Sequence, residues 1–184
     1  LADLYEDTQR ISESEEMYKS AIAILERLAK ENPQRYESDL ILTYNDLATL
    51  YKKSNRFVEC EEMYKSALEI SENLAKNNPK DYEQTLAQSY ENLADLYEDT
   101  QRISESEEMY KSALAIYMHL AQENPQRYES NLAWSYNNLA IIYYNTQRYV
   151  ESESMYKAAL ELFLHLYDIN PQNWDFTLMN CYYW

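Results

Sequence analysis

Apolar side chains recur along this chain at the three- and four-residue spacing that marks one face of a helix. In residues 39–84 one such stripe precedes Ser54-Asn55-Arg56, whose residue types favour turns, and a second stripe follows and stops before Pro79. A residue that precedes a proline disfavours the helical region, so the second stripe should end there. The pattern predicts a hairpin of two helices, at 39–54 and 57–77.

This double stripe returns every 46 residues. YNDLATLY at 44–51 is echoed by YENLADLY at 90–97, by YNNLAIIY at 136–143 and by the half-copy LADLY at 1–5. A fixed period of this size is the signature of stacked units, each of which buries its apolar face against its neighbours. The chain is therefore predicted to be all-α, with a partial repeat at 1–38, full repeats at 39–84, 85–130 and 131–174, and a truncated first helix at 175–184.

The remaining helices follow from the same register. Second helices are expected at 11–31, 103–123 and 149–169, first helices at 85–100 and 131–146, and the tail of a first helix at 1–8. Residues 1–38 and 93–130 differ at only five positions, which indicates a recent duplication of a two-repeat block.

Composition excludes several classes of function. The chain has no glycine, and phosphate-binding loops, dinucleotide fingerprints and nucleophile elbows all need one. A formal net charge of −16 disfavours nucleic acids and anionic membrane surfaces as partners, and no apolar run is long enough to span a membrane. The two cysteines form no disulfide framework and favour a reducing, cytoplasmic compartment. The chain opens without methionine inside a motif, so we expect its true start to lie upstream.

Catalysis and metal binding are also disfavoured. His119 and His165 share a slot that holds arginine or asparagine in the other repeats, which is typical of a surface position. Cys60 stands where the other repeats have serine, and is interpreted as a small core residue. The glutamate clusters of the second helices are interpreted as a solvated face. We predict no catalytic residue, no metal and no cofactor, and hence no enzyme.

The repeated motif resembles a known family. Tyr44-x2-Leu47-Ala48-x2-Tyr51, followed by Cys60-x3-Tyr64, is similar to the tetratricopeptide pattern, although alanine replaces its glycine and the period exceeds the usual 34 residues. The additional length is assigned to the second helix and the Asn-Pro linker, and the chain resembles the extended arrays of kinesin light chains and of bacterial proteins. The resemblance covers the whole chain and implies a right-handed α-solenoid.

In that family the first helices line a concave groove that holds a peptide. The resemblance assigns hydrogen bonding of a peptide backbone to Asn92 and Asn138, and by extension to Asp46, because one amide both donates and accepts. Trp134 and Tyr144 remain open as aromatic contacts, since they lie outside the recurring tyrosine slots. The candidate groove residues are Asn45, Asp46, Thr49, Lys52, Lys53, Glu91, Asn92, Asp95, Glu98, Trp134, Asn137, Asn138, Ile141 and Tyr144. The alternative is that these patches are solvated rims.

Two functional hypotheses follow. The first is a non-enzymatic scaffold that binds a protein or peptide, with basic ligands favoured because acidic patches flank Lys52 and Lys53. Chaperone-binding members of the family grip a terminal carboxylate with lysines and arginines from neighbouring repeats. In this sequence Lys52 and Lys53 stand alone, so acidic C-terminal tails are disfavoured as ligands. The second is a structural or self-stacking spacer within a longer protein. Here head-to-tail association would join the truncated ends, in which Leu1 and Leu178 belong to incomplete first helices.

Overall fold

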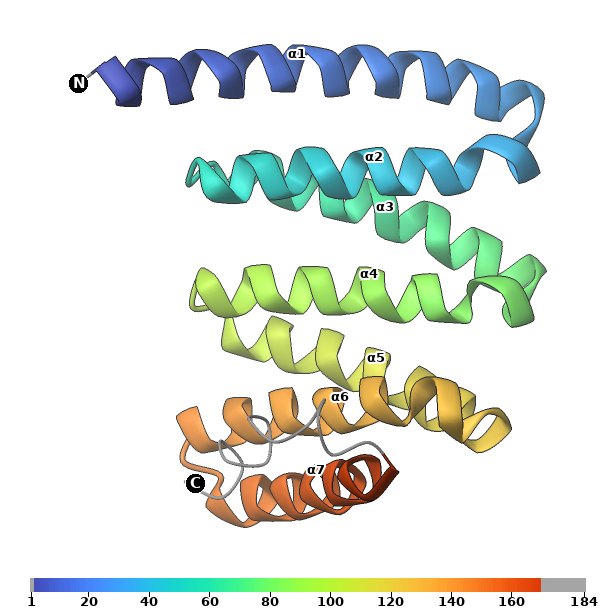
Figure 1. Ribbon diagram of the computed structural model, residues 1–184, viewed down its shortest axis with the longest axis vertical. Helices are drawn as coiled ribbons and strands as arrows, with labels where there is room; N and C mark the ends of the chain where they lie inside the picture. Colours follow the sequence, from blue (N-terminus) through green and yellow to red (C-terminus); the bar gives the residue numbers. More distant parts are fainter. Residues whose placement is uncertain (1, 170–184) are drawn as a thin grey trace. The chain divides into compact units, whose positions relative to one another are not determined.

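The protein is built from helices alone in the part that can be described. The computed structural model describes the backbone of residues 2–169 and the side chains of residues 10–169, and it contains no strand within those residues. Seven helices follow in order (Figure 1): α1 (Ala2–Glu31), α2 (Pro33–Lys53), α3 (Phe57–Asn77), α4 (Pro79–Asp99), α5 (Ile103–Glu123), α6 (Pro125–Asn145) and α7 (Tyr149–Ile169). The prediction of an all-α helical repeat is confirmed, and α1, α3 and α5 end at the residue before the expected asparagine.

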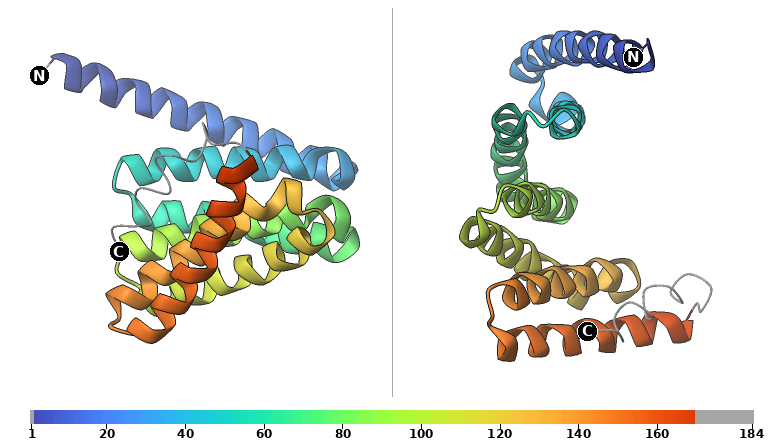
Figure 2. Two further views of the ribbon diagram at one scale, coloured as in Figure 1. Left: turned by 60° about the horizontal axis from the view of Figure 1, so that its bottom comes forward. Right: turned by 90° about the vertical axis from the view of Figure 1, so that its left-hand side faces the viewer.

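The helices form two compact units, Leu1–Tyr82 and Glu83–Trp184, whose boundary falls inside α4. In the first unit α1 packs on α2, and α2 packs on α3. In the second unit α5 packs on α6, and α6 packs on α7, with successive helices lying side by side (Figure 2).

Within each 46-residue period, the boundary between the two helices of the structure differs from the one predicted from the sequence. The first helices begin at Pro33, Pro79 and Pro125, six residues earlier than expected, so each first helix has 21 residues, as many as α3, α5 and α7. Proline is favoured at the first position of a helix because its missing N–H would have no partner there. The Asn-Pro segment is therefore no linker. A single asparagine joins consecutive helices, and the additional length lies in both helices of each repeat.

Helix α1 corrects a second prediction. A turn was expected between residues 8 and 11, but α1 runs unbroken from Ala2 to Glu31. Residues 1–21 are identical in sequence to residues 93–113, which do bend, between α4 and α5. Neighbouring helices supply the contacts that hold such a bend elsewhere, whereas a continuous helix keeps its own backbone bonds. The stub expected at 175–184 lies outside the described residues.

Each three-residue turn has the same backbone. Asn55, Gln101 and Gln147 have φ of 56°, 61° and 61°, in the left-handed region where glycine is usual. The N–H of Arg148 donates to the carbonyl of Tyr143 at 2.8 Å, and the N–H of Gln147 donates to that of Tyr144 at 2.9 Å. These two bonds define a Schellman motif, which the other two turns share. Asparagine and glutamine do here what glycine does in most proteins.

The core lies between the helices, where small residues allow close approach. In the second unit Ala94 packs with Tyr110 of α5 and with Leu139 and Ile142 of α6, while Ala133 packs with Ala159 and Phe163 of α7. Six small residues at the expected slots are at most 3% exposed: Ala48, Ala94, Ala140, Cys60, Ser106 and Ser152. Cys60 is thus a small core residue, as the repeat predicts.

Candidate functional site

The predicted groove residues divide between the two units. Asn45, Asp46, Thr49, Lys52 and Lys53 lie on the last turns of α2 in the first unit. The other nine lie in the second unit, with Glu91, Asn92, Asp95 and Glu98 on α4 and with Trp134, Asn137, Asn138, Ile141 and Tyr144 on α6. In the second unit two first helices, α4 and α6, are joined by a hydrogen bond between Ser135 and Glu91.

An acidic face runs along α4. Glu91, Asp95 and Glu98 follow one another at four and three residues, which places them on one side of a helix. Asp95 Oδ1 accepts a hydrogen bond from the Tyr110 hydroxyl at 2.5 Å, and Glu98 Oε2 accepts from the same hydroxyl at 3.3 Å. Tyr110 is only 2% exposed, so a buried ring of α5 fixes two of the three carboxylates.

Glu91 joins three helices. Its Oε1 accepts a hydrogen bond from the Ser135 hydroxyl of α6 at 3.0 Å, and its Oε2 accepts from the Tyr117 hydroxyl of α5 at 3.4 Å. Burial disfavours the charged form, and this effect with the nearby charge of Asp95 raises the pKa of Glu91 to about 7, against the two hydrogen bonds. The bond to Ser135 holds α4 and α6 next to each other.

The two asparagines assigned to a peptide backbone stand on these two helices. Asn92 and Asn138 are both half-buried, each directly before a leucine that is 1% exposed, Leu93 or Leu139. Asn92 Oδ1 accepts a long hydrogen bond of 3.4 Å from Gln88 Nε2. Asn137 and Ile141 are also half-buried on α6. Amide and apolar groups therefore accompany the acidic face.

Two aromatic side chains of α6 are partly exposed to solvent. Trp134 is 44% exposed and contacts the ring of Phe163 edge-on, with centroids 5.2 Å apart. Tyr144 is 47% exposed and contacts Tyr149 in the same manner at 5.7 Å. Each ring thus contacts another aromatic ring while much of its surface faces solvent.

The α2 candidates have a different chemistry. Asp46, Thr49 and Lys53 are exposed, whereas Asn45 and Lys52 are half-buried. The Thr49 hydroxyl donates to the backbone carbonyl of Asn45 at 2.9 Å, so it is engaged within its own helix. This face is basic and amide-bearing, in contrast to α4.

The interpretation of the glutamate clusters as a solvated face is wrong for three of their members, Glu15, Glu61 and Glu107, whose side chains are 16%, 20% and 16% exposed and are paired with lysines. Arg148 stacks on the Tyr143 ring at 4.2 Å and its Nη1 donates to both oxygens of Glu107, at 2.8 and 2.9 Å. Lys111 pairs with the same carboxylate at 2.5 Å, and the Glu107 side chain is only 16% exposed. Burial opposes ionisation, yet the bonds to Lys111 and Arg148 lower the pKa of Glu107.

The first unit repeats this arrangement, which we call the arginine clamp: an arginine after the turn, the tyrosine beneath it and a glutamate from the preceding second helix. Arg56 stacks on Tyr51 at 4.3 Å and bonds Glu15 at 2.5 Å. Hydrogen bonds from Arg56 and Lys19 lower the pKa of Glu15 to about 2. The clamp could have been found from the sequence, because its arginine, tyrosine and glutamate recur at the period.

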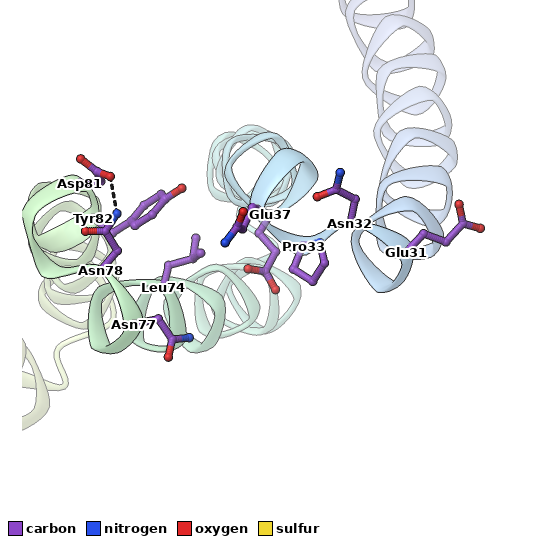
Figure 3. A pocket seen from close by; sticks show the side chains of 10 residues that line it. Glu31, Asn32, Pro33, Glu37, Leu74, Asn77, Asn78, Asp81 and Tyr82 are labelled. Atoms are coloured by element: carbon purple, nitrogen blue, oxygen red, sulfur yellow. Dashed lines mark hydrogen bonds between the residues drawn. The ribbon is translucent and has the colours of Figure 1, made fainter.

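A cavity of about 730 Å³ opens in the first unit between two helix corners. Figure 3 shows Tyr82 and Glu37 facing each other across it, with Leu74 between them. Its lining is rich in carboxylates and amides: Glu31, Asn32, Pro33, Gln34, Glu37, Leu74, Asn77, Asn78, Asp81 and Tyr82. None of the groove candidates contributes to it.

Among the described residues no cluster of histidine, cysteine and carboxylate side chains could hold a metal ion. Both histidines are exposed and lie beside glutamates, His119 with Glu83 at 3.0 Å and His165 with Glu129 at 2.8 Å. No helix in the described part is long and apolar enough to cross a membrane.

Two protein-family models match this chain. A model described as Tetratricopeptide repeat matches residues 39–119, and a second model of the same description matches residues 132–170. This chain is a tetratricopeptide repeat protein. No curated protein matches it.

Solved structures share the architecture of these tetratricopeptide repeats. BtubC (BKLC) from P. vanneervenii is 29% identical with a TM-score of 0.65, and the match covers 85% of this chain but 58% of BtubC. A putative kinesin light chain of nearly identical TPR-like repeats from Podosopora anserina is 20% identical over 94% of this chain and 72% of its own length. Two crystal structures of it give TM-scores of 0.54 and 0.53, which support the fold.

Proposed function

We propose that this tetratricopeptide repeat chain is a non-enzymatic scaffold that binds a peptide bearing basic side chains along α4 and α6. The observation that carries the proposal is the acidic face of α4, where the carboxylates of Asp95 and Glu98 are both fixed by the hydroxyl of the buried Tyr110. Carboxylates fixed in advance lose little freedom when they pair with a ligand, so more of the interaction energy appears as affinity.

The neighbouring groups suit an extended peptide. Asn92 and Asn138 place one amide on each of two adjacent first helices, and an amide side chain matches both the N–H and the C=O of a peptide unit. Trp134 and Tyr144 offer exposed aromatic surface on α6, which suits apolar side chains and cations. The carboxylates select basic ligands mainly through association rate and partner choice.

The test uses two synthetic peptide libraries of matched length and apolar content, one enriched in lysine and the other in glutamate. The full chain is immobilised and retained peptides are sequenced. We expect the lysine library to be enriched and its best peptides to bind the chain in fluorescence anisotropy. Preference for the glutamate library, or retention of neither, contradicts the proposal.

Substitutions then locate the site. The double variant Asn92→Ala/Asn138→Ala should weaken binding of a selected peptide by about tenfold or more, since two hydrogen-bonding amides are lost. The matched control is Asn73→Ala/Asn77→Ala, which removes two exposed amides from α3. Equal affinity of the two double variants would assign the peptide to another surface.

The alternative function, a structural or self-stacking spacer, is favoured by a different observation. The face of α7 carries exposed aromatic and apolar side chains, among them Tyr149 at 58% and Val150 at 80%. A spacer would be indifferent to loss of Asn92 and Asn138. A cytoplasmic location is part of the proposal, and it is supported by the two cysteines of the sequence, which form no disulfide framework.

A further inference from the structure

The cavity of the first unit lies where this repeat departs in sequence from the others. We call it the corner cavity, because it opens between the corner that joins α1 to α2 and the corner that joins α3 to α4. Three carboxylates, four amides and the ring of Tyr82 line it, and its lining includes no lysine, arginine or histidine. Its volume of about 730 Å³ is in the range of ligand-binding sites.

Tyr82 lacks the stacked arginine that its counterparts in the other repeats have. Tyr36 and Tyr128 occupy the same slot, and the guanidinium of the preceding residue lies over each ring, Arg35 at 5.5 Å and Arg127 at 5.1 Å from the ring centroid. The residue before Tyr82 is an aspartate. The half-buried Tyr82 ring therefore borders the corner cavity without that guanidinium (Figure 3).

Glu37, on the opposite side of the corner cavity, departs from its counterparts in the same way. Glu83 occupies its slot in the next repeat and lies beside His119 at 3.0 Å, and the repeat after that has the same glutamate–histidine pair. In the first unit the position of the histidine is held by Asn73, which carries no positive charge at any pH. Two positions that hold basic side chains elsewhere in the chain are thus neutral or acidic around this cavity.

The same departures account for the space. In the second unit Arg127 Nη2 donates to Gln84 Oε1 at 3.0 Å, and this pair of long side chains joins residues 43 positions apart. The corresponding residues of the first unit are Asp81 and Ser38, whose side chains are too short for such a bond. Asp81 instead accepts a hydrogen bond from Asn78 Nδ2 within its own corner, which engages one carboxylate oxygen. The corner cavity thus has the surroundings of an arginine without the arginine.

We propose that the corner cavity binds an arginine side chain of a partner peptide, with the guanidinium stacked on the Tyr82 ring between the carboxylates of Glu37 and Asp81. A guanidinium is planar, stacks on aromatic faces and pairs with carboxylates through parallel hydrogen bonds, which a lysine ammonium cannot reproduce. Three carboxylates in the lining supply the complementary charge.

The size and the other lining groups favour a peptide over a free guanidinium. The corner cavity is larger than one side chain needs, and the amides of Asn32 and Asn77 line it beside the carboxylates. An amide both donates and accepts, so it suits the peptide units that flank an arginine. This site goes beyond the proposed peptide-binding function, because it uses none of the residues assigned to that function.

The test compares three blocked pentapeptides of alanine whose central residue is arginine, lysine or citrulline, which has the shape of arginine without its charge. Binding to the full chain is followed by backbone amide shifts in NMR spectra. The arginine peptide should bind at least about tenfold more tightly than the citrulline peptide and also more tightly than the lysine peptide, with shifts centred on residues 31–37 and 77–82. Agmatine, a guanidinium without a peptide, should bind more weakly than the arginine peptide.

Substitutions in the full chain locate the arginine. Asp81→Arg restores the residue that Arg35 and Arg127 represent in the other repeats, so the fold should tolerate it, and it should weaken binding of the arginine peptide by at least about tenfold. The matched control is Glu62→Arg, which makes the same change of charge at an exposed glutamate of α3 outside the corner cavity. It should leave the affinity unchanged.

Equal affinity for the arginine and citrulline peptides, or an Asp81→Arg chain that binds as tightly as the wild type, overturns the proposal. Equal affinity for agmatine and the arginine peptide would overturn the peptide as the occupant. The variant Asn92→Ala/Asn138→Ala should bind the arginine peptide normally. If that variant loses the arginine peptide while Asp81→Arg keeps it, the arginine belongs to the peptide site on α4 and α6, and this proposal fails while the proposed function stands.

Discussion

Replacing Glu91 by glutamine should make the protein more stable at neutral and alkaline pH. Glu91 is half-buried on α4, its carboxyl group bonds side chains of α5 and α6, and desolvation raises its pKa from 4.5 to about 7. Glutamine keeps one oxygen, which accepts from Ser135, and its amide NH2 can donate to the Tyr117 hydroxyl oxygen; it fills nearly the same volume and cannot ionise. The substitution therefore removes the titration while the packing is retained.

The sign follows from the direction of the shift. The native state binds the proton of Glu91 more tightly than the unfolded chain, so the protonated group favours folding below the unfolded pKa. This contribution is lost as pH rises from 4.5 through about 7. A displacement of this size corresponds to about 3 kcal/mol in the free energy of unfolding, at roughly 1.4 kcal/mol per pKa unit. We expect Glu91→Gln to exceed the wild type by about 2–3 kcal/mol near pH 8 and to match it near pH 4.

Urea unfolding followed by circular dichroism at several pH values measures this difference, provided that the slope with denaturant stays constant. The control is Glu108→Gln, which neutralises an exposed glutamate on α5. Its effect should change little with pH. If the advantage of Glu91→Gln were the same at every pH, or grew as pH fell, the assignment of the buried charge to Glu91 would be refuted.

Three further substitutions test the repeat architecture by thermal or urea unfolding. Gln147→Gly should stabilise by about 1 kcal/mol, because glycine adopts the left-handed turn without steric cost; a loss would contradict the Schellman turn. Ser106→Ala should stabilise by about 1 kcal/mol, since that buried hydroxyl has no hydrogen-bond partner, whereas Ser152→Ala should destabilise by a similar amount because its hydroxyl bonds the Ala140 carbonyl at 2.9 Å. Arg148→Ala should lower the midpoint of unfolding and leave Glu107 half-buried beside Lys111 alone, with high salt reducing the loss; an unchanged midpoint would show that the clamp is only a surface pair.

Much of the fold is predictable because each repeat has the same pattern of apolar stripes and turn residues. The end of every second helix, the small residues at the crossings and the three-residue turns were all predicted from spacing. The starts of the first helices were not, because Pro33, Pro79 and Pro125 can end one helix or begin the next. Only the structure shows that a single asparagine suffices between them.

The sequence predicts which positions on the first helices form the candidate site, but it does not predict which side chains those residues contact. The period points to Glu91, which stands where the other repeats have Asn45 and Asn137, and an acid in an amide slot is a usable signal. Its partners Tyr117 and Ser135 lie 26 and 44 residues away, so the pattern of one helix cannot reveal them. The arginine clamp joins residues 41 positions apart, so the pattern of one helix does not show it, and only the recurrence of its arginine, tyrosine and glutamate at the period points to it.

The identity of residues 1–21 and 93–113 also bears on how the chain finds its fold. During folding, two indistinguishable segments compete for each surface that accepts one of them, so contact energy alone cannot choose between correct and exchanged arrangements. The choice falls to the entropy of closing the connecting chain, which differs by only about 0.6 kcal/mol for each doubling of length. Synthesis from the N-terminus relieves this competition, because residues 1–21 can be committed before their duplicate emerges. A refolding chain lacks that order, so exchanged and intertwined species should appear on refolding and grow with concentration.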